Sequence, residues 1–465
     1  MNHQFYSVLL VCTLLGKSLL GTAQNSASST KDSTSFLNAF AKGKMYGQVR
    51  MLSIFTDNQN ELLDFHATAI GLSLTYRSAI YKGFQWEIGG NLTQNIESSD
   101  FTIKDPTTGA QSRYEMGLFD LTNINKKNVL LRLQALSLKY RFKNGSVLVG
   151  NYVPKNLFIN AQDGRMSPTM VEGIAFELNP SKKLQVKADW IWRISPRSTT
   201  RWYSVANSLG INSTGINPDG SRSQYAGNTQ SAGVGILDIN YQLMPFLKVL
   251  AGNIFVENIF NAAYLKTELS HKVNNTEDLL VGAILVRQNP LGTGGNTDPT
   301  KSYFPTQNHS LLFSSRLAYR LKSWDGSLNF SRINAEGRFL MPREWGAEQI
   351  YTFLSRERNE GLGDVWAYSA RLSRNWFSKR LRTEIGYGYY RLPDVSNVAL
   401  NKYGVPSYTQ LNVLVNYQFS GKWKGLNAQM LYVQKDKQGN VYNNERFVIN
   451  KVNMSQFNIV MNYVF

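Results

Sequence analysis

The last fifteen residues of the chain, 451–465, alternate between two kinds of side chain. Counted back from the end, every second residue is apolar: Phe465, Tyr463, Met461, Ile459 and Phe457. The residues between them include three amides: Val464, Asn462, Val460, Asn458 and Gln456. A period of two places the two sets on opposite faces of a β-strand. The chain therefore ends in a strand with one apolar face and one mostly polar face.

A soluble β-sandwich strand shows the same alternation, but many such strands and a terminal aromatic residue are typical of a transmembrane β-barrel. Lipid then covers the apolar face and a polar lumen meets the other. A helical membrane protein is excluded, since the mean hydropathy is −0.30 and no uninterrupted 18-residue apolar run occurs. The 24 Tyr, 24 Phe and 9 Trp suit the aromatic girdles of a barrel. We predict an all-β, closed, antiparallel transmembrane barrel.

The alternation recurs in about eighteen segments, the first at residues 44–55 and the last at 451–465. Short connections alternate with long ones, as periplasmic turns and external loops do in outer-membrane barrels. An even number of strands also places both chain ends on the periplasmic side. Sixteen strands is the alternative, because strand boundaries are the least certain part of such a prediction.

The N-terminal residues 1–24 are typical of a signal peptide, with an apolar run broken by Lys17 and small residues before a cleavage site near Ala23 or Gln24. The single cysteine, Cys12, lies in this segment, and the alternative of a lipoprotein is disfavoured because Val11 precedes it where a small residue is needed. Residues 25–43, rich in Ser and Thr at their start, are predicted to be a flexible lead-in. Residues 44–465 are predicted to form the barrel domain.

The formal net charge is +18, yet Lys and Arg are scattered along the strands rather than clustered in a basic arm. Nucleic-acid binding is therefore disfavoured, and a cationic pore for anions explains the excess better. No catalytic motif is present, and the four histidines (His3, His66, His271 and His309) have no metal-ligand spacing. We expect neither an enzyme nor a cofactor or metal. The expected partners are small solutes, with lipid and lipopolysaccharide around the barrel.

The phase of each strand assigns several cations to the lumen. An arginine facing lipid would cost about 2–4 kcal/mol at mid-bilayer, so the charged residues of a strand are expected on the face opposite its apolar residues. The predicted lumenal set is Arg50, Lys187, Arg193, Arg316, Arg320, Arg371 and Arg382. Such a set can pass a carboxylate from one guanidinium to the next. The alternative for each residue is a merely solvated lumenal or interfacial charge.

Two long loops carry apolar and proline residues that a plain linker would not need. The first, residues 152–173, contains Leu157, Phe158 and Ile159, and is predicted to fold inward and narrow the pore. The constriction residues would then be Lys155, Asp163 and Arg165. The second, residues 340–364, contains Arg343 and Glu344. If these two residues have no role in function, the expected arrangement is an ion pair between them.

These passages resemble the OprD-type family of substrate-specific outer-membrane porins. The resemblance lies in GNYVPKNLFINAQDGRMSPTMVEG, MPREWGAEQIYTFLSRERNEGLGD, GYGYYRLPDVSNVALNKYGVPSYTQLNV and the closing VNMSQFNIVMNYVF. It covers essentially the whole mature chain. It implies an eighteen-stranded barrel of monomeric type in a Gram-negative outer membrane, with a homotrimer as the alternative. An inward third loop and a basic ladder would guide carboxylate-bearing solutes such as amino acids, small peptides or organic acids.

Three other functions fit the sequence less well than a passive channel. An outer-membrane lipase needs a Ser/His pair that the sequence does not suggest. A structural or adhesin barrel predicts a plugged lumen, whereas the second strand turns small residues inward (Ala69, Gly71, Ser73 and Thr75). TonB-type transport is disfavoured because 465 residues leave no room for a plug and a 22-stranded barrel.

Overall fold

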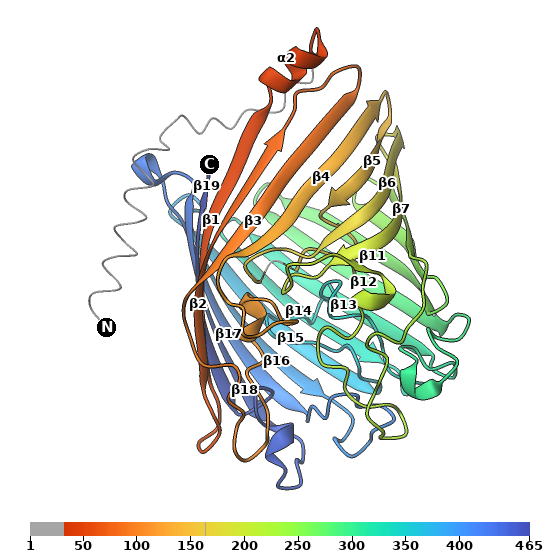
Figure 1. Cartoon of the computed structure of the whole chain (residues 1–465), viewed down its shortest axis with the longest axis vertical. Coiled ribbons are helices and arrows are strands. Elements are labelled where there is room, and N and C mark those ends of the chain that lie inside the picture. The colour runs from red at the N-terminus through yellow and green to blue at the C-terminus, as the bar shows by residue number, and fades with distance from the viewer. Residues whose placement is uncertain (1–31, 163) are drawn as a thin grey trace.

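A computed structural model describes residues 32–162 and 164–465 as one closed antiparallel β-barrel (Figure 1). Within these residues the strands are β1 Lys44–Asp57, β2 Phe65–Arg77, β3 Phe84–Ser98, β4 Leu130–Phe142, β5 Gly145–Tyr152, β6 Met170–Ser181, β7 Leu184–Ser195, β8 Tyr203–Ser204, β9 Val234–Met244, β10 Leu247–Val256, β11 Phe260–Asn274, β12 Glu277–Pro290, β13 Ser310–Leu321, β14 Trp324–Ile333, β15 Val365–Trp376, β16 Leu381–Arg391, β17 Tyr408–Gln418, β18 Leu426–Lys437 and β19 Met454–Val464. The helices are α2 Phe36–Ala41 and the 3₁₀ turns η1 Met116–Leu118, η2 Ala206–Ser208, η3 Pro299–Lys301, η4 Gly421–Trp423 and η5 Glu445–Phe447.

Each wall strand pairs with its neighbours in sequence, and β19 pairs with β1 to close the barrel. Strand β8 is two residues long and pairs only with β7, while β7 also pairs directly with β9. The wall described by residues 32–162 and 164–465 therefore has eighteen strands, and the predicted number and antiparallel order are confirmed. Closure leaves no sheet edge with unpaired backbone groups, which a strand in lipid cannot tolerate.

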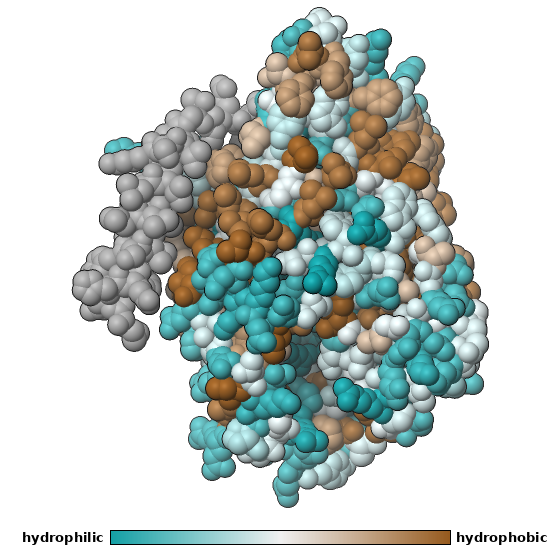
Figure 2. Space-filling view, in the orientation of Figure 1, coloured by the Kyte–Doolittle hydropathy of each residue, from teal (hydrophilic) through white to brown (hydrophobic). Residues whose placement is uncertain are grey.

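The two faces of the wall differ as the alternation predicts. Large hydrophobic side chains exposed on the outer face of β13 include Phe313, Leu317 and Tyr319. The intervening Ser314, Arg316 and Ala318 are buried or half-buried on the inner face. Figure 2 shows hydrophobic side chains gathered over the upper part of one side of the barrel and hydrophilic ones at its lower, loop-bearing end. Among the described residues, no helix has the length and apolar character needed to cross a membrane.

Both ends of the wall lie at the rim that carries the short turns. The Gly47 carbonyl accepts a hydrogen bond from the Phe465 amide at 3.0 Å, and Gln48 pairs with Val464. Part of the predicted flexible lead-in is ordered instead, because Ser35 caps the short helix α2 and Phe36 stacks on Trp86 at 5.0 Å. The predicted signal peptide, 1–24, and the start of the lead-in lie outside the described residues.

The facing of the strands makes a testable prediction at Leu265, which is 44% exposed on the outer face of β11. Leu265→Arg places a charge in hydrocarbon and should lower the free energy of unfolding by about 2–4 kcal/mol. Urea unfolding in lipid vesicles, followed by tryptophan fluorescence, measures this. The control is Asn240→Arg, on the lumenal face of β9, which should cost much less. Equal losses for the two variants would contradict the assigned facing.

Candidate functional site

Six of the seven cations assigned to the lumen lie on the inner face. Arg50 donates from Nε to Asn462 Oδ1 and from Nη1 to the Arg165 carbonyl, each at 2.7 Å. Lys187 lies in register with Glu177 on β6 and with Asp238 on β9. The other four are on the inner faces of β13, β15 and β16: Arg316, Arg320, Arg371 and Arg382.

Arg193 is the exception, and its lumenal assignment is wrong. The pairing of β6 with β7 steps from Glu172–Arg193 to Gly173–Ile191, so Trp192 is an extra residue in a β-bulge. A bulge shifts the alternation by one position. Ile191 and Ile194 are both fully buried, whereas the Arg193 side chain is 47% exposed and pairs with Glu172 at 3.3 Å on the outside.

Several lumenal cations have carboxylate partners nearby. Asp325 lies 3.4 Å from Arg316 and 3.3 Å from Arg320, measured from nitrogen to oxygen, and Asp278 lies 3.7 Å from Arg320. Arg382 donates to Glu384 at 2.9 Å. These side chains are partly exposed to the lumen, so the pairs are screened and can exchange partners with a passing anion.

The β14–β15 loop, residues 334–364, is hydrogen-bonded to inner-face side chains of successive wall strands. From residue 340 to residue 356 it exchanges hydrogen bonds with lumenal side chains of β12 to β19 in order: Gln288, Ser314, Ser331, Arg371, Tyr390, Gln410, Lys435 and Asn458. The polar residues that alternate along these strands therefore hold a loop as well as line a lumen.

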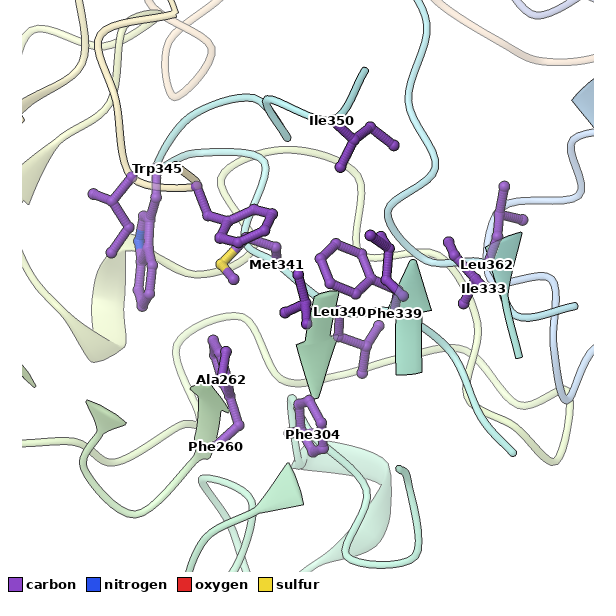
Figure 3. Close-up of a cluster of buried hydrophobic side chains, with 14 of the residues drawn as sticks. Phe260, Ala262, Phe304, Ile333, Phe339, Leu340, Met341, Trp345, Ile350 and Leu362 are labelled. Atoms are coloured by element: carbon purple, nitrogen blue, oxygen red, sulfur yellow. The ribbon is translucent and has the colours of Figure 1, made fainter. Parts of the chain in front are cut away.

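Apolar residues of the same loop pack against the wall between those bonds. Phe339, Leu340, Met341 and Trp345 are almost fully buried, and Figure 3 shows them grouped with Phe260, Ala262 and Ile333 of the strands. Trp345 also donates from Nε1 to Ser208 Oγ at 2.8 Å, which joins the loop to η2. This packing explains the aliphatic and aromatic content of the loop.

The β5–β6 loop, residues 153–169, contacts lumenal side chains from strands on both of its sides. Asn156 donates to Tyr264 Oη at 2.6 Å and to Asp238 Oδ2 at 3.1 Å. Arg132 of β4 donates to Ser167 Oγ at 2.7 Å, and a Cβ at Gly71 of β2 would lie 3.0 Å from Met166 Cε.

The two loops also bind each other. Asn160 donates from Nδ2 to the Ala347 carbonyl at 2.8 Å, and Arg358 donates to Gln162 Oε1 at 2.7 Å. Of the predicted constriction residues, Arg165 is 5% exposed and in contact with Arg50, Lys155 is exposed, and Asp163 lies outside the described residues.

The predicted Arg343–Glu344 pair is wrong. Arg343 donates to Glu360 at 2.6 Å and lies 3.6 Å from the centre of the Tyr403 ring, whereas Glu344 accepts from the amides of Gly210 and Asn212. Adjacent residues in an irregular loop point in different directions. Arg343 therefore pairs within the β14–β15 loop, whereas Glu344 joins this loop to the one that contains Gly210 and Asn212.

The loops bring together cations that sequence reasoning did not select, and we call these the loop cations: Arg113, Arg356, Arg358 and Lys451. Arg113 lies near Arg343 and Arg358, and Lys451 lies near Arg113 and Arg343. Burial, aided by repulsion from these neighbours, lowers the pKa of Lys451 to about 7. Burial likewise lowers the pKa of Arg165 to about 9, with Arg356 adding to the effect.

Glu357 lies among these cations but does not cancel their charge at neutral pH. Its side chain is 1% exposed, and neither carboxyl oxygen has a hydrogen-bond partner among the described residues. Burial, with repulsion from Glu348, raises the pKa of Glu357 to about 8. Arg356, Glu357 and Arg358 belong to a loop that the sequence singled out, and Arg113 comes from a loop without any such signal. Lys451, predicted to begin the closing strand, lies instead in the loop before β19, which starts at Met454.

The described residues contain no group of three or more His, Cys, Asp or Glu side chains arranged to hold a metal ion. The lumen and its loops present guanidinium, ammonium and amide donors, together with carboxylates such as Asp325 and Glu360. Such donors bind carboxylates and other anions.

No family model matches this sequence, and neither does any curated protein. Solved structures do match the fold. The crystal structure of Pseudomonas aeruginosa OpdK with vanillate has a TM-score of 0.71 at 13% identity, covering 92% of this chain and 99% of that one. Acinetobacter baumannii OccAB3 has a TM-score of 0.72 at 16% identity, with 91% and 99% covered. Pseudomonas aeruginosa OccK9 (OpdG) has a TM-score of 0.73 at 12% identity, with 92% and 99% covered.

The chain has the fold of these OprD/Occ channels. Another match, OpdK, is described as an outer-membrane protein, with a TM-score of 0.69 at 12% identity over 91% of this chain and 98% of that one. The resemblance drawn from the sequence motifs is thus confirmed at the level of the fold. At these identities the likeness concerns backbone architecture, and the roles of individual side chains rest on the contacts described above.

The Arg343–Glu360 pair predicts how firmly the β14–β15 loop is held. The two side chains are 12% and 1% exposed, and removing one partner of a buried pair costs about 3–5 kcal/mol. We expect Glu360→Gln to loosen the loop and expose Arg356 and Arg358 to trypsin, as seen by limited proteolysis of the folded barrel. The control, Glu97→Gln, removes a carboxylate that is 70% exposed and should leave the digestion pattern unchanged. Resistance of Glu360→Gln equal to that of the wild type would refute this role.

Proposed function

We propose that this protein is a passive outer-membrane channel for small anionic or zwitterionic solutes, with carboxylates as the preferred class. The observation that carries the proposal is the cationic lining. Six inward-facing Lys and Arg side chains on the wall are followed, towards the long loops, by Arg165 and the loop cations. A passage lined mostly by one sign of charge concentrates ions of the opposite sign.

The two packed loops would serve as the constriction. The β5–β6 and β14–β15 loops bind the inner wall and each other, so they are held in place rather than free to move with the solvent. Arg50 and Arg165 would stand where the wall meets the constriction. The wall arginines Arg316, Arg320 and Arg371 would guide the solute further along the lumen. The exposed Lys155 would act at most as a charge near the entrance.

The choice of carboxylates rests on guanidinium chemistry and on one relative. A planar guanidinium binds a carboxylate with two parallel hydrogen bonds, yet releases it readily when hydrated. OpdK was crystallised with vanillate, an aromatic carboxylate, and its fold is shared by this chain. We infer a solute of the same chemical class, such as an organic acid, an amino acid or a small peptide.

The alternative is a structural or adhesin barrel that conducts nothing. The extensive packing of loop residues against the wall favours it, because loops that fill the lumen completely would close the passage. The exposure of partly hydrated cations such as Arg320 and Arg382 favours the channel instead, since charges in a sealed core would be buried. A single-channel recording separates the two functions.

Charge selectivity should depend on the lumenal arginines. In a planar bilayer under a salt gradient, we expect the wild type to favour anions. Arg316→Ala/Arg320→Ala should lower the anion-to-cation permeability ratio by roughly threefold or more, because it removes two cations and leaves Asp325 in the lumen. The matched control is Arg193→Ala, which removes an arginine from the outer face. Equal permeability ratios in the wild type and the double variant would show that Arg316 and Arg320 do not determine the charge selectivity. A folded barrel without conductance would favour the structural alternative.

Selectivity should also fall as the pH rises from 6 to 8, a range that stays below the pKa of about 9 of Arg165. Lys451, with a pKa of about 7, loses its positive charge in this interval, and Glu357, with a pKa of about 8, gains a negative one. Both changes reduce the attraction for anions. We expect Lys451→Gln/Glu357→Gln to flatten this pH dependence of the reversal potential, while Lys104→Gln, on an exposed loop, leaves it as in the wild type. A pH dependence that survives the double variant would assign it to other groups.

A further inference from the structure

Arg374 lies on the outer face of the barrel, near the end of β15 at the rim of short turns. The outer face of β15 alternates through Tyr368, Ala370 and Leu372 before Arg374 and Trp376. The guanidinium carbon of Arg374 lies 3.6 Å from the centre of the Trp376 ring and 4.8 Å from the centre of the Trp324 ring. Trp324 is on β14 and is the residue directly opposite Arg374. The Arg374 Nε has no hydrogen-bond partner among the described residues. The Arg374 guanidinium thus lies close to two indole rings, an arrangement we call the arginine clamp, and it has no ion pair with a carboxylate among the described residues.

An apolar hollow of about 630 Å³ begins at the next outward position along the same two strands. It is lined by Leu317, Tyr319, Gly326, Ala370, Ile385 and Tyr387. Gly326 follows Trp324 on the outer face of β14, and its opposite residue Leu372 precedes Arg374 on that of β15. The hollow therefore extends from the arginine clamp towards the middle of the wall.

The backbone around this hollow has room for a residue larger than glycine at Gly326. A Cβ on Gly326 would meet nothing closer than Leu372 Cδ1 at 3.8 Å, so a larger side chain would fit. Its neighbours on the outer face are large, including Leu328 at 64% and Leu372 at 46% exposure. The outer surface is therefore hollow at Gly326, between larger neighbours.

We propose that this place is a binding site for one phospholipid, with its phosphate on Arg374 and an acyl chain in the hollow. The clamp lies at the rim of short turns, where β14 begins and β15 ends, and this is the depth at which phosphates meet a barrel. The two tryptophans orient the guanidinium and suit the interface, and the hollow accepts an apolar chain pointing to the bilayer centre.

An anionic headgroup suits the surroundings better than a zwitterionic one. The adjoining turns expose Lys322, Lys379 and Arg380. Glu277, which contacts the lining residue Tyr319, already accepts a hydrogen bond from it at 2.6 Å. The site rests on the proposed place of the barrel in a membrane, but not on the solute that the lumen carries. A second copy of the chain is the competing occupant of an apolar hollow.

Native mass spectrometry of the full barrel, released from detergent with added phosphatidylglycerol, tests the site. We expect a retained lipid in the wild type that is lost in Arg374→Gln, which removes the cation, and in Ala370→Leu, which fills the hollow. The controls should retain it. They are Arg193→Gln, at an outward arginine elsewhere, and Ala251→Leu, at a small outward residue of β10.

Equal retention by all five proteins would overturn the proposal. It would also be overturned if the wild type formed oligomers that Arg374→Gln and Ala370→Leu dissolved, since the hollow would then hold a second chain. Unchanged single-channel conductance in the variants with lost lipid would support a separate lipid site. A failure of the channel proposal would appear as absent conductance with lipid retention intact, so the two outcomes can be told apart.

Discussion

Backbone pairing around a closed ring is the constraint on which the rest of this structure depends. In hydrocarbon, each unpaired backbone amide or carbonyl costs several kcal/mol, so no strand can be left at an edge. The pairing of β19 with β1, from Gln48–Val464 to Asp57–Ser455, completes the ring. Once the ring is closed, every strand must show one face to lipid and the other to an enclosed space. The period of two in the sequence is the direct consequence.

The enclosed face is polar for two reasons rather than one. Residues such as Ser314, Gln410 and Asn458 bind the backbone and side chains of the β14–β15 loop, while the cations face the remaining space. This division explains how a barrel with long loops can hold them in a defined position. It also explains why lumenal charges occur together with buried apolar residues of the loops, as in the cluster around Trp345.

Strand existence, facing and order could be predicted from the sequence because lipid imposes a strict chemical alternation on each strand. The same reasoning failed at Arg193, since a bulge at Trp192 changes the phase without any mark in the residue types. It also failed for Arg343 and Glu344: Arg343 pairs with Glu360, seventeen residues further along the same loop, and Glu344 binds the amide of Asn212 in a loop far away in sequence. The loop cations Arg113 and Lys451 meet only through tertiary packing, which no local pattern encodes.

The proposed function requires a lumen that conducts ions and recognises the carboxylate group. The most direct test is single-channel recording of the wild-type barrel in a planar bilayer, with benzoate or benzamide added on one side. These solutes have the same ring and differ in their charge. We expect concentration-dependent current interruptions with benzoate and none with benzamide. Equal interruptions by both, or a folded barrel that carries no current, would contradict the proposed function.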